Sequence, residues 1–183
     1  MLDVNYGQVI YNAKPEAKDR LPKEMAVYDL LEKLEIPYWR LDHDAAMTME
    51  ACEGIDQIMD ICYCKNLFLR NTQKTEFYLL LIGHDKKFKT AVLSKQIGTA
   101  RLSFAEPEFM EKYLNITPGA VSIMGLMNDS ERKVHLLVDK DVFTSEYFGC
   151  HPCVNTASLK VKTSDIIDKF LKYTGHDIRF VEL

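Results

Sequence analysis

The sequence contains no long apolar run and no sign of a secretion signal. None of its 183 residues lies in a stretch that approaches the roughly 20 apolar residues of a membrane-spanning helix. The first residues show no basic region followed by an apolar core, and the chain contains no internal repeat or low-complexity tract. We therefore expect a single cytoplasmic domain that has no membrane partner.

Common catalytic signatures are also absent. The sequence has neither the glycine-rich P-loop nor the G-x-G-x-x-G pattern, so no nucleotide is indicated and we expect no cofactor. It has no G-x-S-x-G turn, which is typical of serine hydrolases of the α/β class. His84, His135 and His176 show no diagnostic spacing and are interpreted as structural or surface residues.

Cysteines are few and odd in number, with five in the chain. A chain of this length needs no disulfide scaffold, so reduced thiols are the simpler interpretation. Cys62 with Cys64, and Cys150 with Cys153, could in principle form a four-thiolate zinc site, but both pairs lack the glycine of a zinc knuckle. Cys150-His-Pro-Cys153 also resembles a thiol redox motif, although a strand-like segment follows it. We predict no metal site, and both thiol hypotheses stay open as alternatives.

Charged residues are distributed unevenly along the chain. The net charge of −4 argues against broad binding to DNA or to other nucleic acids. From Leu41 to Cys64 there are six acids and no Lys or Arg. From Asp85 to Arg101 a single acid accompanies five cations, which are Lys86, Lys87, Lys89, Lys95 and Arg101. This basic segment is either solvated surface or a patch that faces phosphates.

Hydrophobic spacing predicts a mixture of helices and strands. Helices are expected at 22–36, 48–53, 55–60, 91–96, 106–114 and 164–174, and strands at 38–42, 62–70, 76–82, 102–105, 120–127, 134–138 and 178–181. Residues 1–20 are polar and are expected to form an N-terminal extension, with 21–183 as a single domain. Because the order lacks a regular βαβ rhythm, we predict an α+β fold with a curved mixed β-sheet and surrounding helices.

One predicted strand carries a lysine on an apolar face. Alternation along 62–70 places Cys64, Asn66 and Phe68 on one side and Lys65 with Leu67 on the other. A lysine in such a position either extends its amine to the rim of the apolar surface or meets an anion in a cleft.

Five motifs occur in order along the chain. They are His43-Asp-Ala-Ala-Met-Thr-Met-Glu50, Lys65-Asn-Leu-Phe-Leu-Arg-Asn71, Arg101-Leu-Ser-Phe-Ala105, Pro118-Gly-Ala-Val-Ser-Ile-Met-Gly-Leu-Met-Asn-Asp129 and His151-Pro-Cys-Val-Asn-Thr-Ala157. Together they resemble the YbaK/prolyl-tRNA synthetase editing-domain family, and within it the freestanding alanyl-tRNA(Pro) deacylases. The resemblance covers most of the chain from residue 20 onward.

The resemblance implies that the protein hydrolyses the ester of a mischarged tRNA. Prolyl-tRNA synthetase cannot fully reject alanine, because missing methylenes supply only about 1–3 kcal/mol of discrimination. The editing pocket of such proteins admits the smaller residue and excludes proline by size. The expected partners are mischarged tRNA(Pro), above all Ala-tRNA(Pro), and prolyl-tRNA synthetase. Cys-tRNA(Pro), another aminoacyl-tRNA, and a non-catalytic binding module are the alternatives.

The resemblance also implies roles for individual residues. Lys65 is expected to hold the phosphate or ribose of the terminal adenosine. Backbone N–H groups at Gly125 are expected to approach the ester carbonyl, and His151 to position the substrate or transfer a proton. The ribose hydroxyl of the tRNA helps the attacking water, so no metal and no protein nucleophile are required.

The amino-acid pocket is expected to contain further residues of the same motifs. The predicted substrate-binding residues are His43, Thr48, Asn66, Ser122, Ile123, Met124, Cys150, Cys153, Asn155 and Thr156. Ile123-Met124 stands where the family usually has Pro-Phe, and Cys150 and Cys153 flank the histidine. These two differences from the family pattern are expected near the amino-acid pocket, where they bear on which amino acid is accepted. The five cations of the basic segment are the candidates for contact with the acceptor stem, and such contacts are salt-sensitive.

Overall fold

The computed structural model of the chain describes residues 6–45, 49–61 and 64–183. Its strands form two separate sheets. The first is antiparallel and contains, in spatial order, β1 (Tyr6–Tyr11), β2 (Tyr38–His43), β8 (Ala157–Lys162) and β7 (Tyr147–Cys150). The second is mixed and contains β5 (Leu102–Phe104), β3 (Cys64–Asn71), β4 (Phe77–Gly83), β6 (Val134–Asp139) and β9 (Ile178–Val181).

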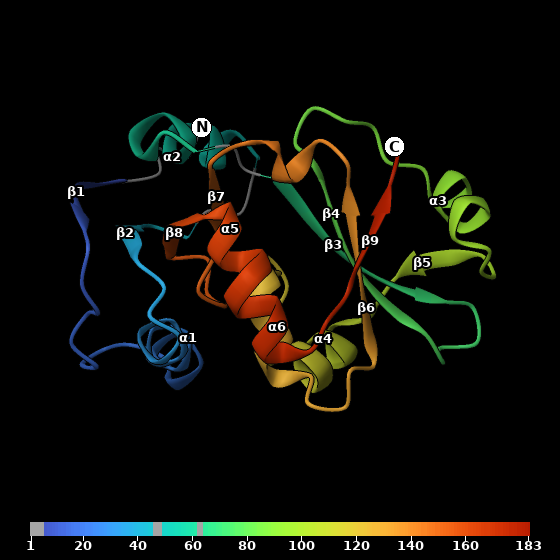
Figure 1. Cartoon of the computed structure of the whole chain (residues 1–183), viewed down its shortest axis with the longest axis horizontal. Helices are drawn as coiled ribbons and strands as arrows, with labels where there is room; N and C mark the ends of the chain where they lie inside the picture. Colours follow the sequence, from blue (N-terminus) through green and yellow to red (C-terminus); the bar gives the residue numbers. More distant parts are fainter. Residues whose placement is uncertain (1–5, 46–48, 62–63) are drawn as a thin grey trace.

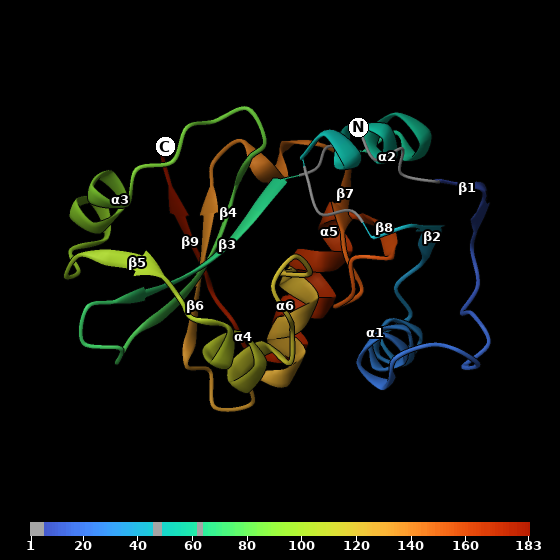
Figure 2. The same ribbon diagram turned by 180° about the vertical axis from the view of Figure 1, so that it is seen from behind.

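Helices surround the two sheets and fill part of the space between them (Figure 1). They are α1 (Pro22–Lys33), α2 (Met49–Met59), α3 (Thr90–Ile97), α4 (Pro107–Leu114), the 3₁₀ segments η1 (Ile123–Asn128) and η2 (Val142–Thr144), and a C-terminal helix made of α5 (Thr163–Asp165), the π-helical η3 (Ile166–Phe170) and α6 (Leu171–Thr174). Figures 1 and 2 show α4 and the C-terminal helix between the sheets, with α3 at the far side of the mixed sheet. No helix in the described part of the chain is long and apolar enough to cross a bilayer.

The main hydrophobic core lies between the two sheets. It joins Phe148 and Leu159 of the antiparallel sheet to Phe68 and Leu79 of the mixed sheet, and the C-terminal helix contributes Phe170. Each of these side chains is almost completely buried, so the apolar surface removed from water holds the sheets together.

A second, smaller core covers the opposite face of the mixed sheet. Leu93 and Ile97 of α3 pack there against Leu69, Leu80 and Leu137. Because β4 supplies residues to both cores in alternation, its run of apolar residues is buried on both sides, as its sequence indicates. We refer to this α3-covered surface of the mixed sheet as the outer face.

The α+β class and the mixed sheet agree with the sequence prediction, and the second sheet is an addition to it. The segment 120–127, expected to be a strand, is instead largely the 3₁₀ helix η1, so this prediction is wrong. The cause is local, because the Ser122 hydroxyl accepts the N–H of Met124 and starts a helical turn.

Two further segments differ from the prediction. The helix expected to break at Gly54 runs without interruption from Met49 to Met59. Residues 6–11, which look aperiodic in sequence, form β1 and pair with β2 along one edge of the antiparallel sheet. Pairing with a neighbouring strand supplies the ordering that the local sequence pattern does not show.

Candidate functional site

Two buried histidines lie next to each other at the end of the antiparallel sheet. His43 is the last residue of β2, and His151 follows β7, with a separation of 6.2 Å between ring centroids. The Nδ1–H of His151 donates to the carbonyl of Ala157, 2.9 Å away, because a carbonyl can only accept. His43 is held from both sides, since its Nδ1–H donates to the Asp44 carbonyl at 2.7 Å and its Nε2 accepts from the Ser158 hydroxyl at 2.9 Å.

Burial keeps both imidazoles neutral. Removal from water lowers the pKa of His151 to about 4, against an ordinary value of 6.5, and the neighbouring His43 adds to this effect. Burial also lowers the pKa of His43. With its proton fixed on Nδ1, neutral His151 carries its lone pair on Nε2. Its Nε2 can therefore accept a hydrogen bond at neutral pH.

The η1 segment packs against the histidine loop. The Ser122 hydroxyl donates to the carbonyl of His151 at 2.6 Å, and the N–H of Gly125 donates to the carbonyl of Ser122 at 3.0 Å. A Cβ on Gly125 would lie 2.5 Å from Cδ1 of Ile116 and 3.0 Å from Cβ of Leu114. Close packing therefore accounts for glycine at this position. Since its N–H is already used inside η1, the contact of Gly125 with an ester carbonyl stays a prediction.

Four further residues predicted for the amino-acid pocket are buried in the main core. Ile123 and Met124 belong to the main core, as do Cys150 and Cys153. Burial raises the pKa of the Cys150 thiol and raises that of Cys153 to about 12, so neither forms a thiolate readily at neutral pH. This environment does not favour the redox hypothesis.

The zinc hypothesis gains nothing from the described residues either. No group of three or more His, Cys, Asp and Glu side chains within 6–45, 49–61 and 64–183 is arranged to hold a metal ion. Cys62, one of the four cysteines considered for such a site, lies outside the described residues, as does Thr48 from the predicted substrate-binding set.

Lys65 and Asn66 point to opposite faces of β3. Leu67, which shares its face with Lys65, packs against the outer core, whereas Cys64 and Phe68 belong to the main core. The Lys65 amine donates to the carbonyl of Lys86 at 2.8 Å. On the other side, the amide nitrogen of Asn66 donates to the Cys64 carbonyl at 3.1 Å, and its Oδ1 is buried without a hydrogen-bond partner. The structure thus places Lys65 on a different face from the histidine pair.

Asn155 and Thr156 line a surface hollow of about 510 Å³ near the start of α1. Arg20 and Asp42 stand in its wall and form a bidentate ion pair, with N–O distances of 2.8 and 3.0 Å. The hollow is linked to the histidine pair, because the Thr156 carbonyl accepts the backbone N–H of His43 at 3.0 Å.

Comparison with known proteins identifies the family. The family model for the aminoacyl-tRNA editing domain matches residues 43–169, a span that contains both histidines, Lys65 and Gly125. The chain belongs to this family. It is 35% identical over 161 residues to the prolyl-tRNA editing protein ProX of Acetoanaerobium sticklandii, covering 87% of this chain and 97% of that protein.

More distant similarities extend to a vertebrate protein and to a solved structure. The prolyl-tRNA synthetase associated domain-containing protein 1 of Danio rerio is 27% identical over 150 residues, covering 81% of this chain and 80% of that protein. A solved protein described as a candidate trans-editing enzyme for prolyl-tRNA synthetase has a TM-score of 0.67 at 14% identity, covering 90% of this chain and 99% of that chain. The latter likeness concerns the fold, which is therefore that of an editing domain.

The five cations predicted to contact tRNA differ in their environment within this editing domain. The amine of Lys86 lies 2.5 Å from the buried carboxylate of Asp139 and 2.6 Å from that of Asp141, so this lysine holds the fold together. Lys87, Lys89, Lys95 and Arg101 are exposed, and their contact with tRNA stays a prediction.

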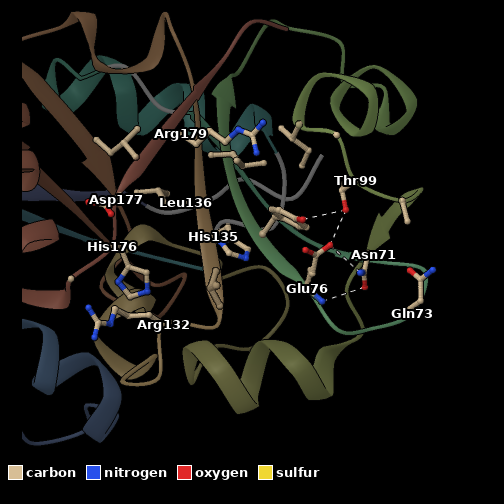
Figure 3. Close-up of a pocket in the computed structure, with 18 residues that line it drawn as sticks. Asn71, Gln73, Glu76, Thr99, Arg132, His135, Leu136, His176, Asp177 and Arg179 are labelled. Carbon is tan, nitrogen blue, oxygen red and sulfur yellow. Dashed lines mark hydrogen bonds between the residues drawn. The ribbon is translucent and has the colours of Figure 1, made fainter.

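A polar hollow of about 730 Å³ also lies on the outer face of the editing domain (Figure 3). Glu76 stands at its wall and accepts hydrogen bonds from the hydroxyl of Thr99 at 2.8 Å and the amide of Asn71 at 3.1 Å. These donors lower the pKa of Glu76. His135 lies beside the ring of Tyr78, with 5.3 Å between centroids. The Glu76 carboxylate is already hydrogen-bonded to Thr99 and Asn71. We therefore interpret this hollow as part of the scaffold and do not assign it a ligand.

Sequence reasoning did not single out Ser158, Ala157 or Asp44, which orient the two histidines. Two of these act through backbone carbonyls, which leave no mark on residue type. Ser158 could have been found from its position in β8, since it is a fully buried hydroxyl among apolar residues.

Proposed function

We propose that this editing domain hydrolyses the ester bond of mischarged tRNA(Pro), with Ala-tRNA(Pro) as its main substrate. The observation that carries the proposal is the match over 97% of the ProX protein, in a chain whose His151 is a buried, neutral imidazole. A neutral imidazole with a fixed tautomer suits a group that accepts a hydrogen bond from the attacking water or from a ribose hydroxyl.

The reaction needs little from the protein beyond positioning and proton transfer. A water oxygen attacks the ester carbonyl, the bond to the ribose oxygen breaks, and that oxygen takes up a proton. We assign His151 Nε2 to the water or ribose hydroxyl, with His43 holding the adjoining loop through Ser158. Lys65, on the other face of β3, is assigned to a phosphate of the terminal nucleotide.

Small size of the acylated residue is proposed as the basis of selection. Ile123, Met124, Cys150 and Cys153 are all completely buried around the histidine loop. A close-packed interior gives way only at a cost of about 1–3 kcal/mol per inserted group, so it can reject a proline ring while it accepts a methyl group. Serine and then cysteine have the next smallest side chains among the candidates.

The direct test measures hydrolysis of Ala-, Cys-, Ser- and Pro-tRNA(Pro) by the purified protein. We expect Ala-tRNA(Pro) to be hydrolysed fastest and Pro-tRNA(Pro) to survive. The variant Lys65→Ala should act more slowly, while Lys172→Ala, which removes an exposed lysine on α6, serves as its matched control. The rate should be the same after dialysis against a chelator.

Two outcomes would overturn the proposal. If all four aminoacyl-tRNAs are bound but none is hydrolysed, the protein is a binding module. If Lys65→Ala keeps full activity, Lys65 has no part in the reaction.

A further inference from the structure

A second surface hollow, distinct from the histidine pair, lies beside Lys65. It has a volume of about 640 Å³ and is bordered by β3, the start of α3 and β5 on the outer face. Its apolar wall is formed by Leu67, Phe88 and Phe104, and its charged side chains are those of Lys65 and Lys89. None of the described residues that line it is acidic.

Phe104 in this hollow carries an exposed aromatic ring. Its exposed fraction is 58%, and its ring meets that of Phe88 edge-on, with 6.2 Å between centroids. Apolar surface that stays in contact with water forgoes the favourable free energy of burial. A flat apolar ligand placed on the ring would recover it.

The charges around the hollow favour an anionic ligand. Lys65 and Lys89 stand at its edge, and the exposed Lys87 lies two positions before Lys89 in the same loop. The carboxylate that follows β5, Glu106, is already paired with Arg70 at 2.8 Å and with Lys74 at 2.9 Å. A lysine pair beside an exposed aromatic ring is the arrangement with which proteins bind single-stranded nucleic acid.

We propose that this hollow binds an unpaired nucleotide at the 3′ end of the tRNA, with the base stacked on Phe104 and Phe88. Lys65 and Lys89 then contact the flanking phosphates, which gives Lys65 a ligand on the face to which it points. The inference rests on the proposed function, because it places the end of the same RNA whose ester is hydrolysed. It adds an aromatic platform to a site for which the sequence predicted only cations.

The test compares binding of a short RNA that ends in single-stranded CCA to three variants of the full chain. Phe104→Ala removes the platform, and Phe104→Tyr keeps a flat ring. Phe180→Ala removes an equally exposed phenylalanine, at 59%, from β9 outside the hollow. We expect Phe104→Ala to weaken binding by about 5- to 100-fold, with the other two within about twofold of the unaltered protein.

Kinetics with Ala-tRNA(Pro) give an independent readout. Phe104→Ala should raise KM by a similar factor while kcat changes little, because the platform binds the RNA rather than the ester. Equal thermal stability of the Phe104→Ala and Phe180→Ala variants shows that folding is not the cause.

The outcomes separate this inference from the proposed function. Unchanged RNA affinity and KM in Phe104→Ala, or an equal loss in Phe180→Ala, would overturn the platform even if Ala-tRNA(Pro) is hydrolysed. RNA binding that depends on Phe104 in a protein that hydrolyses no aminoacyl-tRNA(Pro) would support the platform and overturn the hydrolase proposal.

Discussion

The histidine pair and the hollow beside Lys65 lie on different faces of the molecule and differ in almost every physical property. His43 and His151 are buried, neutral and held by fixed hydrogen bonds. The hollow is open and positively charged, and it exposes an aromatic ring. Burial favours a defined protonation state, whereas exposure favours capture of a large, charged ligand. We therefore expect changes at the two regions to affect different measurements.

The largest effect is expected at His151. Replacing it in His151→Asn should lower the rate of Ala-tRNA(Pro) hydrolysis by about 10²- to 10⁴-fold, the range over which a positioned proton acceptor acts. RNA affinity should stay unchanged, since the outer face is not altered. The matched control is His135→Asn, an exposed histidine on the outer face, which should keep full activity. A variant that loses RNA affinity together with activity would contradict the separation of the two regions.

Stability should depend on pH through the same residue. The unfolded state binds a proton at His151 near pH 6.5, but the folded state does so only near pH 4, so the free energy of unfolding falls as the pH drops between these values. The loss should reach roughly 2–3 kcal/mol for a pKa difference of this size.

Urea unfolding at pH 7 and at pH 4.5 measures this dependence. His151→Asn should remove most of the difference between the two pH values. Carboxylates with a lowered pKa, such as Asp42 and Glu106, contribute equally to the unaltered protein and to the variant, so their effect cancels in the comparison. An unchanged pH dependence in the variant would show that His151 is not the group responsible.

The packing of η1 provides the next prediction. A methyl group on Gly125 meets Cδ1 of Ile116, so Gly125→Ala should lower the free energy of unfolding by about 1–3 kcal/mol through overpacking. Ile116→Val deletes the atom that is met, and the double variant should recover part of the loss. Chemical denaturation of the unaltered protein, the two single variants and the double variant measures these free energies. If the losses of the two single variants simply add in the double variant, Gly125→Ala does not act through Ile116.

The smallest effects are expected from single lysines of the basic segment. Lys89→Ala should weaken RNA binding only a few-fold and reduce the slope of log affinity against log salt by about 0.7, the contribution of one phosphate on a single strand. Lys86→Ala should instead lower stability, because its amine pairs with the buried Asp139. Titrations at several salt concentrations distinguish the two. If the slope of log affinity against log salt changes equally in Lys86→Ala and Lys89→Ala, the two lysines do not have separate roles.

Much of the fold could be predicted from residue spacing. The bounds of β9 and the two faces of β3 follow directly from it. The segment before Asp129 misled the prediction, since its apolar residues resemble a strand while a hydroxyl cap and a close contact at Gly125 produce a 3₁₀ helix. The Ser122 cap is local, but the contact of Gly125 is with Ile116, which lies outside this segment.

The residues of the candidate site could be proposed from the sequence, but their arrangement in space could not. The motifs point to Lys65 and His151, and alternation shows that Lys65 opposes Asn66 on β3. Spacing within one strand does not show which face meets the second sheet. The separation of Lys65 from the histidines therefore required the packing of both sheets.

The pairing of β2 with β8 has a consequence for synthesis. The hydrogen bond between His43 and Ser158 joins residues 115 positions apart, and β2 has no complete sheet until β8 has left the ribosome. Contacts of such long range slow folding, because a large loop must close before they form. During translation, the nascent chain therefore leaves the β8 edge of β2 unpaired for most of its elongation, and it acquires its histidine pair only when almost the whole protein has been made.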